Sequence, residues 1–404
     1  MRKFFPILIM IVLVVTMILG GCAPTAPTPS PTPGTTPAPA PAPTEPLKIG
    51  ALLPFTGVCA SWGPQFESGL RYGLDELGWK MAGRPVELLV DDSGSDISLM
   101  MDKLKKMVLQ DKIAFLSGPF LGPMRPAAYE WFKTIEKPPI GINCLASDRI
   151  EYTGDYQFHL AQAYTDEPFA AAKYFHDKMG VKNAVTIAWD YECGYQFIQG
   201  FTDGFKAAGG TVNQQVWTEI GAADYTPYLL SLKVNDGDGI ASMIAGEALP
   251  FIMDQAKKLG ILQKTHWFAT ADPEPWGEIT EGMVYGIKYD VSIDSPINKK
   301  FVEAFTAKVG HTPTNWEYSH WESIMVANEA VKAAGGDTDP DKLKQIMLGL
   351  KMDTPSGPLS FDEGRIAVRT RYAVQIQNVN GKYVPVIIDT VPNHHTLEKI
   401  YPYP

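Results

Sequence analysis

The sequence predicts an α/β protein in which each of two lobes holds a parallel sheet flanked by helices. A length of 404 residues is too great for one ordinary hydrophobic core and suits two domains with a leader. Short apolar runs alternate with longer segments of helical period, which is typical of right-handed βαβ units. A second series of this alternation begins near Asp166, and it indicates the second lobe.

Residues 1–21 have the features of a lipoprotein signal peptide. Arg2 and Lys3 precede an apolar run over residues 4–19, and Leu-Gly-Gly-Cys follows, ending at Cys22. The apolar run is shorter than the roughly 20 residues that a spanning helix needs, so a retained transmembrane anchor is the weaker alternative. We expect acyl chains on Cys22 to hold the mature protein on the outer face of a cell membrane or in the periplasm.

Residues 22–46 predict an extended linker. The segment is almost entirely Pro, Thr, Ala, Ser and Gly, and its single charge is Glu45. Such a chain favours polyproline II, which rises by roughly 3.1 Å per residue. We expect a semi-stiff stalk between the anchor and the folded body.

The charge balance argues against a nucleic-acid partner. The chain has 35 basic and 45 acidic residues, and loss of Arg2 and Lys3 with the leader takes the net charge from −10 to about −12. No stripe of Lys and Arg stands out that would neutralise phosphates.

The first series of elements begins with a buried strand over residues 49–53. Phe66, Leu70, Leu74 and Leu77 then recur at helical spacing, so they predict a helix with one apolar face. Open α/β folds bind small molecules at such strand-to-helix turns, beside the free N–H groups of a helix N-terminus. The remaining elements of this series are predicted as strands over 86–90, 113–116 and 139–143, with helices over 97–110 and up to Trp131.

The second series repeats the plan and then changes character. Strands are predicted over 184–188, 212–217, 240–245 and 266–269, with helices over 170–179, 196–208, 225–233 and 251–259. A strand over 282–290 precedes helices over 297–309, 319–334 and 342–350. Asn380-Gly381 between apolar runs over 369–378 and 383–389 predicts a terminal β-hairpin.

Several motifs resemble those of one family in their order and spacing. They are KIGALLPFTG, the glycines Gly63 and Gly69, VDDSGSD, SGPF, WDYECGY, ADYTPYLLSLK, FIMDQAKKLG, TEGMVYG and SGPLSFDEG. Together they resemble the branched-chain amino acid (Leu/Ile/Val) type of periplasmic substrate-binding protein of ABC transporters, over most of residues 47–391. The resemblance implies the two-lobed type I periplasmic-binding-protein fold with a three-crossing hinge.

The resemblance also implies where the lobes begin and end. The N-terminal lobe would contain residues 47–163 and 288–360, and the C-terminal lobe residues 164–287 and 361–404. The chain would cross near 161–164, 285–288 and Phe361, and such hinges let two lobes close on a ligand.

In the family the ligand lies between the lobes, against strand-to-helix turns from each. The resemblance places these candidate ligand contacts here: Ser61, Trp62, Phe120, Leu121, Cys144, Leu145, Tyr191, Tyr195, Glu247 and Asp272. Trp62, Phe120, Tyr191, Tyr195 and Trp276 would enclose an apolar ligand body, or alternatively belong to the core.

Two carboxylates are candidates for holding an ammonium group. Asp272 follows FATA, where the family places the carboxylate that grips the ligand's ammonium, and Glu247 is the second candidate. The alternative for each residue is a solvated loop carboxylate.

The chain departs from the family at the positions that contact the ligand carboxylate. The family presents hydroxyl side chains there, whereas this sequence has Phe120-Leu121 and Cys144-Leu145. Backbone N–H groups after Gly118, helped by Arg125 or Arg149, would have to hold an anion instead. The family's tyrosine-glycine pair is also reversed, as Gly194-Tyr195. These departures disfavour a standard leucine pocket and favour an aromatic or otherwise modified ligand.

No motif for catalysis, a metal or a cofactor stands out. Cys59, Cys144 and Cys193 have no metal-ligand spacing, and the histidines are scattered, as structural histidines are. The sequence contains no Gly-x-Ser-x-Gly elbow, Walker loop, GxGxxG fingerprint or HExxH helix. We therefore expect no enzymatic activity.

The sequence favours a monomeric solute receptor that captures a small amphipathic ligand, either an amino acid or an aromatic or amino-acid-like compound. Its partners would be the permease and ATPase subunits of an ABC importer. The alternative is a ligand-sensing subunit for a signalling protein, and the residues alone do not separate the two.

Overall fold

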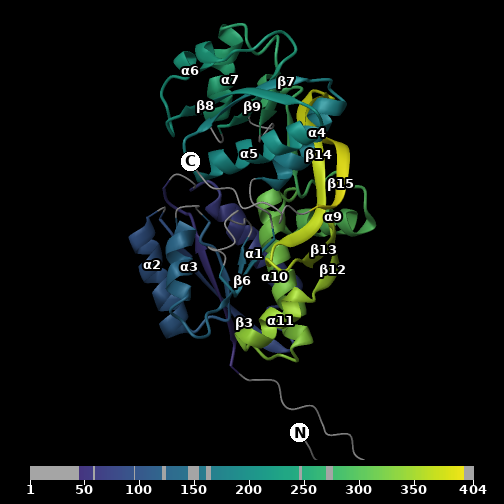
Figure 1. The fold of residues 1–404 in the computed structure, drawn as a ribbon. Coiled ribbons are helices and arrows are strands. Elements are labelled where there is room, and N and C mark those ends of the chain that lie inside the picture. The colour runs from purple at the N-terminus through teal and green to yellow at the C-terminus, as the bar shows by residue number, and fades with distance from the viewer. Residues whose placement is uncertain are drawn as a thin grey trace, which may run out of the picture. The chain divides into compact units, whose positions relative to one another are not determined.

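The computed structural model describes residues 45–394 except 58–59, 95, 121–123, 144–153, 161–164, 245–247 and 270–275. Within this part of the chain the strands form two separate sheets with helices packed on them (Figure 1). The predicted α/β fold with two sheets is confirmed. Cys22, the leader and most of the linker lie outside the described residues.

The first sheet is parallel apart from one edge. Among the described residues it has six strands in the order β2-β3-β1-β4-β5-β6, and only the pairing of β2 with β3 is antiparallel. Their bounds are β1 (Leu47–Leu53), β2 (Lys80–Met81), β3 (Arg84–Asp92), β4 (Phe115–Ser117), β5 (Ile140–Asn143) and β6 (Gln157–His159).

Helices from distant parts of the sequence accompany this sheet. They are α1 (Gly63–Glu76), α2 (Ile97–Lys106) with a π-helix (Met107–Asp111), α3 (Met124–Phe132), α10 (Asn315–Ala333) and α11 (Pro340–Leu348). Phe66, Leu70 and Leu74 on α1 are fully buried, as their helical spacing predicts, and share one core with α10 residues such as Val326. Burial of such side chains stabilises a fold by about 1.5–3 kcal/mol each.

Glycines bring α1 into close contact with α10 (Figure 1). A Cβ at Gly69 would lie 2.2 Å from the carbonyl oxygen of Glu317, and one at Gly73 would lie 2.9 Å from Cβ of Ile324. The Ser68 hydroxyl also donates to the Glu317 carboxylate at 2.8 Å. A larger residue at position 69 cannot be accommodated without moving one of the helices apart from the other.

The second sheet is mixed. Among the described residues it has nine strands. Eight follow the order β12-β13-β14-β11-β10-β9-β7-β8, and the ninth, β15, pairs with β14. The parallel part consists of β7 (Asn183–Trp189), β8 (Thr211–Thr218), β9 (Gly239–Met243), β10 (His266–Ala269) and β11 (Val284–Ile287). The antiparallel part consists of β12 (Lys351–Thr354), β13 (Gly357–Phe361), β14 (Ala367–Val379) and β15 (Lys382–His394).

In the sequence, the remaining helices precede, connect or follow the parallel strands of the second sheet. They are α4 (Asp166–Asp177), α5 (Glu192–Ala207), α6 (Thr226–Ser231), α7 (Ala248–Lys258), a 3-10 turn (Gly277–Thr280) and α9 (Pro296–Val309). None of the described helices is long and apolar enough to cross a membrane.

The antiparallel strands connect features of both predicted lobes. β13 pairs with β14 in the second sheet, yet Leu359 and Phe361 on β13 pack into the core of the first sheet. The hydrogen bonds of β13 therefore place it in the second sheet, whereas its buried side chains belong to the core of the first sheet. The predicted lobe boundaries, 47–163 with 288–360 and 164–287 with 361–404, stay a prediction.

Candidate ligand-binding site

The turn after β1 is held by a carboxylate at the end of β3. Asp92 Oδ1 accepts the backbone N–H groups of Phe55 at 2.9 Å and Thr56 at 3.2 Å, and its Oδ2 accepts the Thr56 hydroxyl at 2.6 Å. Burial favours the neutral carboxyl, but the hydrogen bonds to Thr56 and to backbone N–H groups hold the Asp92 pKa below its usual range. The charged Asp92 therefore fixes the start of the turn that leads to Trp62.

Rings from three segments gather beyond this turn. Trp62 and Phe66 come from the start of α1, Phe120 follows β4, and Trp316 and His320 come from α10. The Phe120 ring centroid lies 5.4 Å from Trp62, 4.8 Å from Phe66 and 5.3 Å from Trp316, while His320 stacks on Phe66 at 4.2 Å. We call these five rings the aromatic wall. The three spacings around Phe120 lie in the range of favourable edge-to-face and offset contacts.

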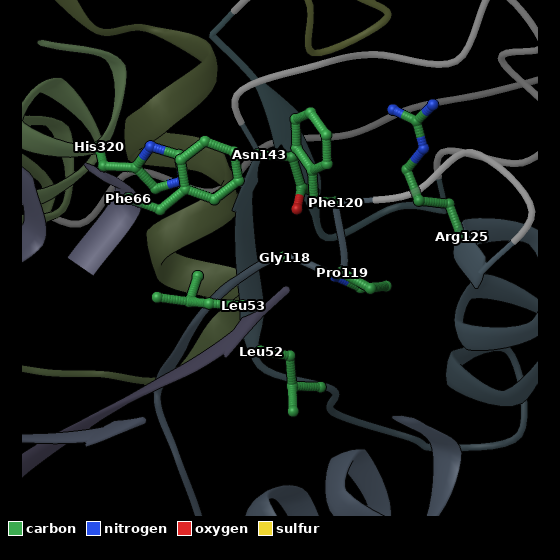
Figure 2. Close-up of a pocket in the computed structure, with 9 residues that line it drawn as sticks. All are labelled: Leu52, Leu53, Phe66, Gly118, Pro119, Phe120, Arg125, Asn143 and His320. Atoms are coloured by element: carbon green, nitrogen blue, oxygen red, sulfur yellow. The ribbon is translucent and has the colours of Figure 1, made fainter. Parts of the chain in front are cut away.

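A small pocket opens beside the aromatic wall. Figure 2 shows that its lining includes Phe66, Phe120, Arg125, Asn143 and His320. Leu53, Gly118 and Asn143 stand at or directly after the carboxyl ends of the neighbouring parallel strands β1, β4 and β5. The pocket therefore lies at the edge of the sheet where open α/β folds place their ligands.

Gly118 lets the chain pass close to β1 at this edge. Its φ is +96°, and a Cβ there would lie 2.4 Å from the carbonyl oxygen of Leu52. No other residue type has both this conformational freedom and this small size. Gly118 thus sets the direction in which Phe120 enters the pocket.

Arg125 provides a buried positive charge. It lies in the first turn of α3, is 2% exposed, and extends in Figure 2 to the same side as the Phe120 ring. One turn later, burial raises the pKa of the Tyr129 hydroxyl to about 12; the charge of Arg125 opposes the shift and that of Glu192, on α5, adds to it. The two charges that shift the Tyr129 pKa therefore come from both series of elements, Arg125 from the first and Glu192 from the second.

His320 is neutral. Its Nδ1 lies 2.8 Å from the carbonyl oxygen of Trp316, which can only accept, so Nδ1 carries the proton. Burial lowers the His320 pKa to about 3; the charge of Lys288 lowers it further, and the bond to Trp316 opposes the shift. In this tautomer Nε2 is an acceptor.

The structure brings some of the predicted contacts together and does not describe others. Trp62 and Phe120 meet in the aromatic wall, and exposed Ser61 directly precedes Trp62. Leu121, Cys144, Leu145, Glu247 and Asp272 lie outside the described residues, as do Cys59 and Arg149.

Tyr191 and Tyr195 belong to a second group of rings, at the carboxyl end of β7. Tyr191 immediately precedes α5, and its ring centroid lies 6.1 Å from that of Trp189. Tyr195 packs edge-on against Trp217 at 4.8 Å and donates its hydroxyl proton to Asp190. Trp276 instead packs, partly buried, against the core of the second sheet, and Cys193 is a buried free thiol. The tyrosines thus have neighbours of their own, which hold their rings in place.

Sequence reasoning did not anticipate Trp316 and His320 as part of the site. Both lie on α10, far along the chain from α1. The available signal is their spacing of four residues, which places an aromatic ring and a histidine on one helical face. That spacing does not reveal which sheet edge the face meets.

Comparison with known proteins gives matches over most of the chain. The sequence matches the periplasmic binding protein family over residues 46–382. A relative named Leu/Ile/Val-binding protein homolog 6, from Brucella abortus, is 24% identical over 358 residues, which cover 85% of this chain and 91% of the relative.

Solved structures of similar fold come from several bacteria. An ABC transporter substrate-binding protein from Sphaerobacter thermophilus has a TM-score of 0.80 and 24% identity, and the match covers 86% of this chain and 98% of that one. A solute-binding protein of an ABC transporter from Rhodopseudomonas palustris, solved in complex with 3,4-dihydroxybenzoic acid, has a TM-score of 0.77 and 22% identity, with coverage of 86% and 97%. These two likenesses show a shared fold.

Proposed function

Since this chain belongs to the periplasmic binding protein family, we propose that it is a lipoprotein that captures a small amphipathic ligand and delivers it to an ABC importer. The fold is the type I fold of substrate-binding proteins, which are extracytoplasmic ligand carriers and not enzymes. The ligand, the lipid anchor and a monomeric state are the parts that we propose.

One observation carries the proposal for the ligand. The aromatic wall and the buried guanidinium of Arg125 meet at one pocket, at the carboxyl ends of β1, β4 and β5. Apolar rings with one convergent charge are what a small amphipathic molecule needs, because its body is desolvated while its polar end keeps a partner.

Two ligand classes are compatible with the comparisons. The relative is named for Leu, Ile and Val, whereas the solute-binding protein from Rhodopseudomonas palustris was solved with an aromatic acid. We propose an amino acid or an aromatic or amino-acid-like compound. The proposed contacts are Ser61, Trp62, Phe120, Tyr191 and Tyr195, together with Leu121, Cys144, Leu145, Glu247 and Asp272 from the resemblance.

We further propose that residues 47–163 with 288–360 and residues 164–287 with 361–404 form two lobes that close on the ligand. The resemblance puts the crossings of the chain between these lobes near 161–164, 285–288 and Phe361. Closure would exclude water from the pocket and strengthen the interaction of a ligand charge with Arg125.

The anchoring part of the proposal rests on the N-terminal sequence. Residues 1–21 would be removed, Cys22 would carry the lipid, and residues 22–46 would form the stalk. Permease and ATPase subunits would then meet a receptor that stays at the membrane surface.

A thermal-shift screen tests the carrier function. A ligand at 100 times its Kd stabilises a protein by about 2.7 kcal/mol. The screen should contain amino acids, aromatic acids and uncharged aromatic compounds, each also run with an unrelated protein as a control for effects on the dye. If no compound of these classes raises the Tm of this protein specifically, the proposed function is wrong.

A further inference from the structure

We infer that β14 is the hinge strand of this chain, that the lobes turn about Thr370, and that the buried arginines on either side, Arg369 and Arg371, each hold the strand to a different lobe. This inference rests on the proposed lobe closure and assigns residues to it. It moves the third crossing from Phe361, where the resemblance puts it, to Thr370.

The packing of β14 changes from one side of Thr370 to the other. On the N-terminal side, Ala367 is fully buried in the core of the first sheet, which also contains Phe361. On the C-terminal side, Ala373 is fully buried in a different core, together with Phe175 of α4. The strand therefore leaves one hydrophobic core and enters another between these two alanines.

The strand pairing of β14 changes at the same place. Residues 367–369 pair with β13, whereas residues 372–375 pair with β11. The ladder between β14 and β15 has a register shift between Arg369 and Arg371. Such an irregularity interrupts a ladder and lets a strand bend. The neighbours that stiffen β14 thus differ on the two sides of Thr370.

Arg369 binds groups that belong with the first sheet. Its guanidinium forms the bidentate pair with Glu322 of α10, at 2.7 and 2.9 Å. It also donates at 3.0 Å to the carbonyl oxygen of Leu160, a residue buried in the core of the first sheet. These bonds hold the N-terminal part of β14 to α10 and to the chain that follows β6.

Arg371 pairs instead with a residue of α4. Its Nη2 lies 3.7 Å from Oδ2 of Asp166, in the first turn of that helix, and both side chains are fully buried. Burial lowers the Arg371 pKa to about 10; the charge of Asp166 opposes this shift, and that of Arg369 adds to it. Two buried like charges so near each other each need a carboxylate.

The helix that carries Asp166 is itself fixed on the second sheet. A Cβ at Gly286 of β11 would lie 2.0 Å from the carbonyl oxygen of Glu167, so α4 and β11 are in close contact. The pair of Arg371 with Asp166 therefore joins the C-terminal part of β14 to a helix that belongs with the second sheet.

The two pairs have a role that stability alone does not explain. Apolar side chains of similar volume often stabilise a fold as well as a buried ion pair does, or better. A buried charge, however, has one suitable partner, whereas an apolar side chain fits many positions. One pair on each side of Thr370 thus fixes β14 to both lobes and confines the turn to the residue between them.

A contact that crosses this boundary is weak enough to change during the turn. The Tyr372 hydroxyl donates to the carbonyl oxygen of Ser356, in the loop between β12 and β13, at 3.0 Å. A single neutral hydrogen bond contributes less than a buried charged pair does. The lobes can therefore break it while the bonds of both arginines stay intact.

Pulsed electron paramagnetic resonance on the full-length protein in detergent, without added ligand, tests the hinge. Spin labels on non-natural amino acids replace two exposed residues, Lys105 of α2 and Lys257 of α7, so the native cysteines stay in place. The width of the distribution of distances between the labels reports the range of lobe motion.

The first comparison locates the turn. Thr370→Gly should widen the distribution by about 1.5-fold or more, because glycine allows more backbone conformations. The matched control is Val368→Gly, which lies in the segment of β14 that pairs with β13 and should leave the width unchanged. Equal widths for Thr370→Gly and wild type, or equal widening by Val368→Gly, would overturn the assignment of Thr370.

The second comparison tests the arginines. Replacing Asp166 by Leu and Arg371 by Met together should widen the distribution while leaving the Tm nearly unchanged, because no buried charge is left alone. A lower Tm without widening would mean that the pair only stabilises the fold, and the proposed role of Arg371 would be wrong. If this double variant does not fold, Asp166→Asn takes its place with the same expected widening.

The outcomes separate the hinge from the carrier function, because the distance measurement needs no ligand. Widening in Thr370→Gly together with a failed thermal-shift screen removes the carrier function and keeps the hinge. A compound that raises the Tm, with no widening in any variant, keeps the carrier function and removes the hinge.

Discussion

Replacing Glu322 by Gln should destabilise the protein strongly, because it leaves a buried guanidinium without its counter-charge. Glu322 on α10 and Arg369 on β14 are both fully buried. Arg369 Nη1 donates to Glu322 Oε2 at 2.7 Å, and its Nη2 donates to Oε1 at 2.9 Å. The pair is bidentate and therefore among the stronger geometries that an ion pair adopts.

The same guanidinium connects segments from several parts of the chain. Its Nη1 also donates to the carbonyl oxygen of Leu160 at 3.0 Å, and its Nη2 donates to the Tyr318 hydroxyl at 3.1 Å and to Ser356. Loss of the carboxylate charge thus affects a network that joins β14, α10 and the segments beside two of the proposed crossings.

The magnitude follows from the burial of the pair. Breaking a buried ion pair by removing one partner costs about 3–5 kcal/mol. With an unfolding entropy of about 2.1 cal/mol/K per residue, a folded body of roughly 350 residues loses about 4–7 °C in Tm for that change. Thermal unfolding followed by circular dichroism measures the shift.

Two further variants make the interpretation specific. Glu329→Gln removes a carboxylate from the same helix, but at an exposed pair with Lys332, and should cost less than about 1 kcal/mol. Replacing both buried partners together, with Glu322→Leu and Arg369→Met, should recover most of the loss, because neither charge is then left alone. A Tm for Glu322→Gln as close to wild type as that of Glu329→Gln would refute the reasoning.

The remaining predictions concern the anchor, the lobes and one histidine. Cys22→Ala should move the protein from the membrane to the soluble fraction in cell fractionation; retention in washed membranes would mean that residues 4–19 are a spanning anchor. Small-angle scattering should show a smaller radius of gyration at saturating ligand, and an unchanged profile with binding confirmed would contradict lobe closure. Because burial lowers the His320 pKa to about 3 from its usual 6.5, the unfolded chain binds a proton that the folded chain does not as the pH falls below about 6.5. Wild type should therefore lose about 1.4 kcal/mol more per pH unit than His320→Phe between pH 6 and 4 in urea unfolding, and equal slopes would exclude this contribution.

Most of the regular elements could be predicted because their residues carry a local signal. The buried parallel strands of the two sheets are short apolar runs, and α1 shows its apolar face directly in the spacing of Phe66, Leu70 and Leu74. The hairpin of β14 and β15 was predicted from Asn380-Gly381, whose φ values of +55° and +83° are those of the turn that this dipeptide favours. In these cases the local preference and the tertiary fold agree.

The elements that were missed have weak local signals. β6 has a single apolar residue, Phe158, between Gln157 and His159, which are buried although polar. β12 and β13 have four and five residues, so neither contains enough alternation to be recognised. The helix predicted over 97–110 instead passes from α2 into a π-helix, and apolar spacing does not report such a change of hydrogen bonding.

The site was only half predictable, because it depends on a contact between helices that are distant in sequence. Trp62 and Phe120 follow strands of the first sheet, where parallel strands present their carboxyl ends to ligands, and the family resemblance selected them among the residues of those turns. Trp316 and His320 follow no strand of that sheet. Their contribution depends on the docking of α10 against α1, for which the spacing of residues on either helix gives no direct evidence.

Gly69 connects the docking of α10 on α1 with the geometry of the pocket. The contact of Gly69 with the Glu317 backbone lies about one turn along α1 from Phe66 and about two turns from Trp62, and it is next to Trp316 on α10. The absence of a side chain at position 69 therefore decides how near the two helices approach at the level of the aromatic wall. The glycine spacing that supports the family resemblance thus has a physical role here, since it allows rings from both helices to surround Phe120 before a ligand arrives. Rings held in this way lose little freedom on binding, which is how preorganisation raises affinity without further contacts.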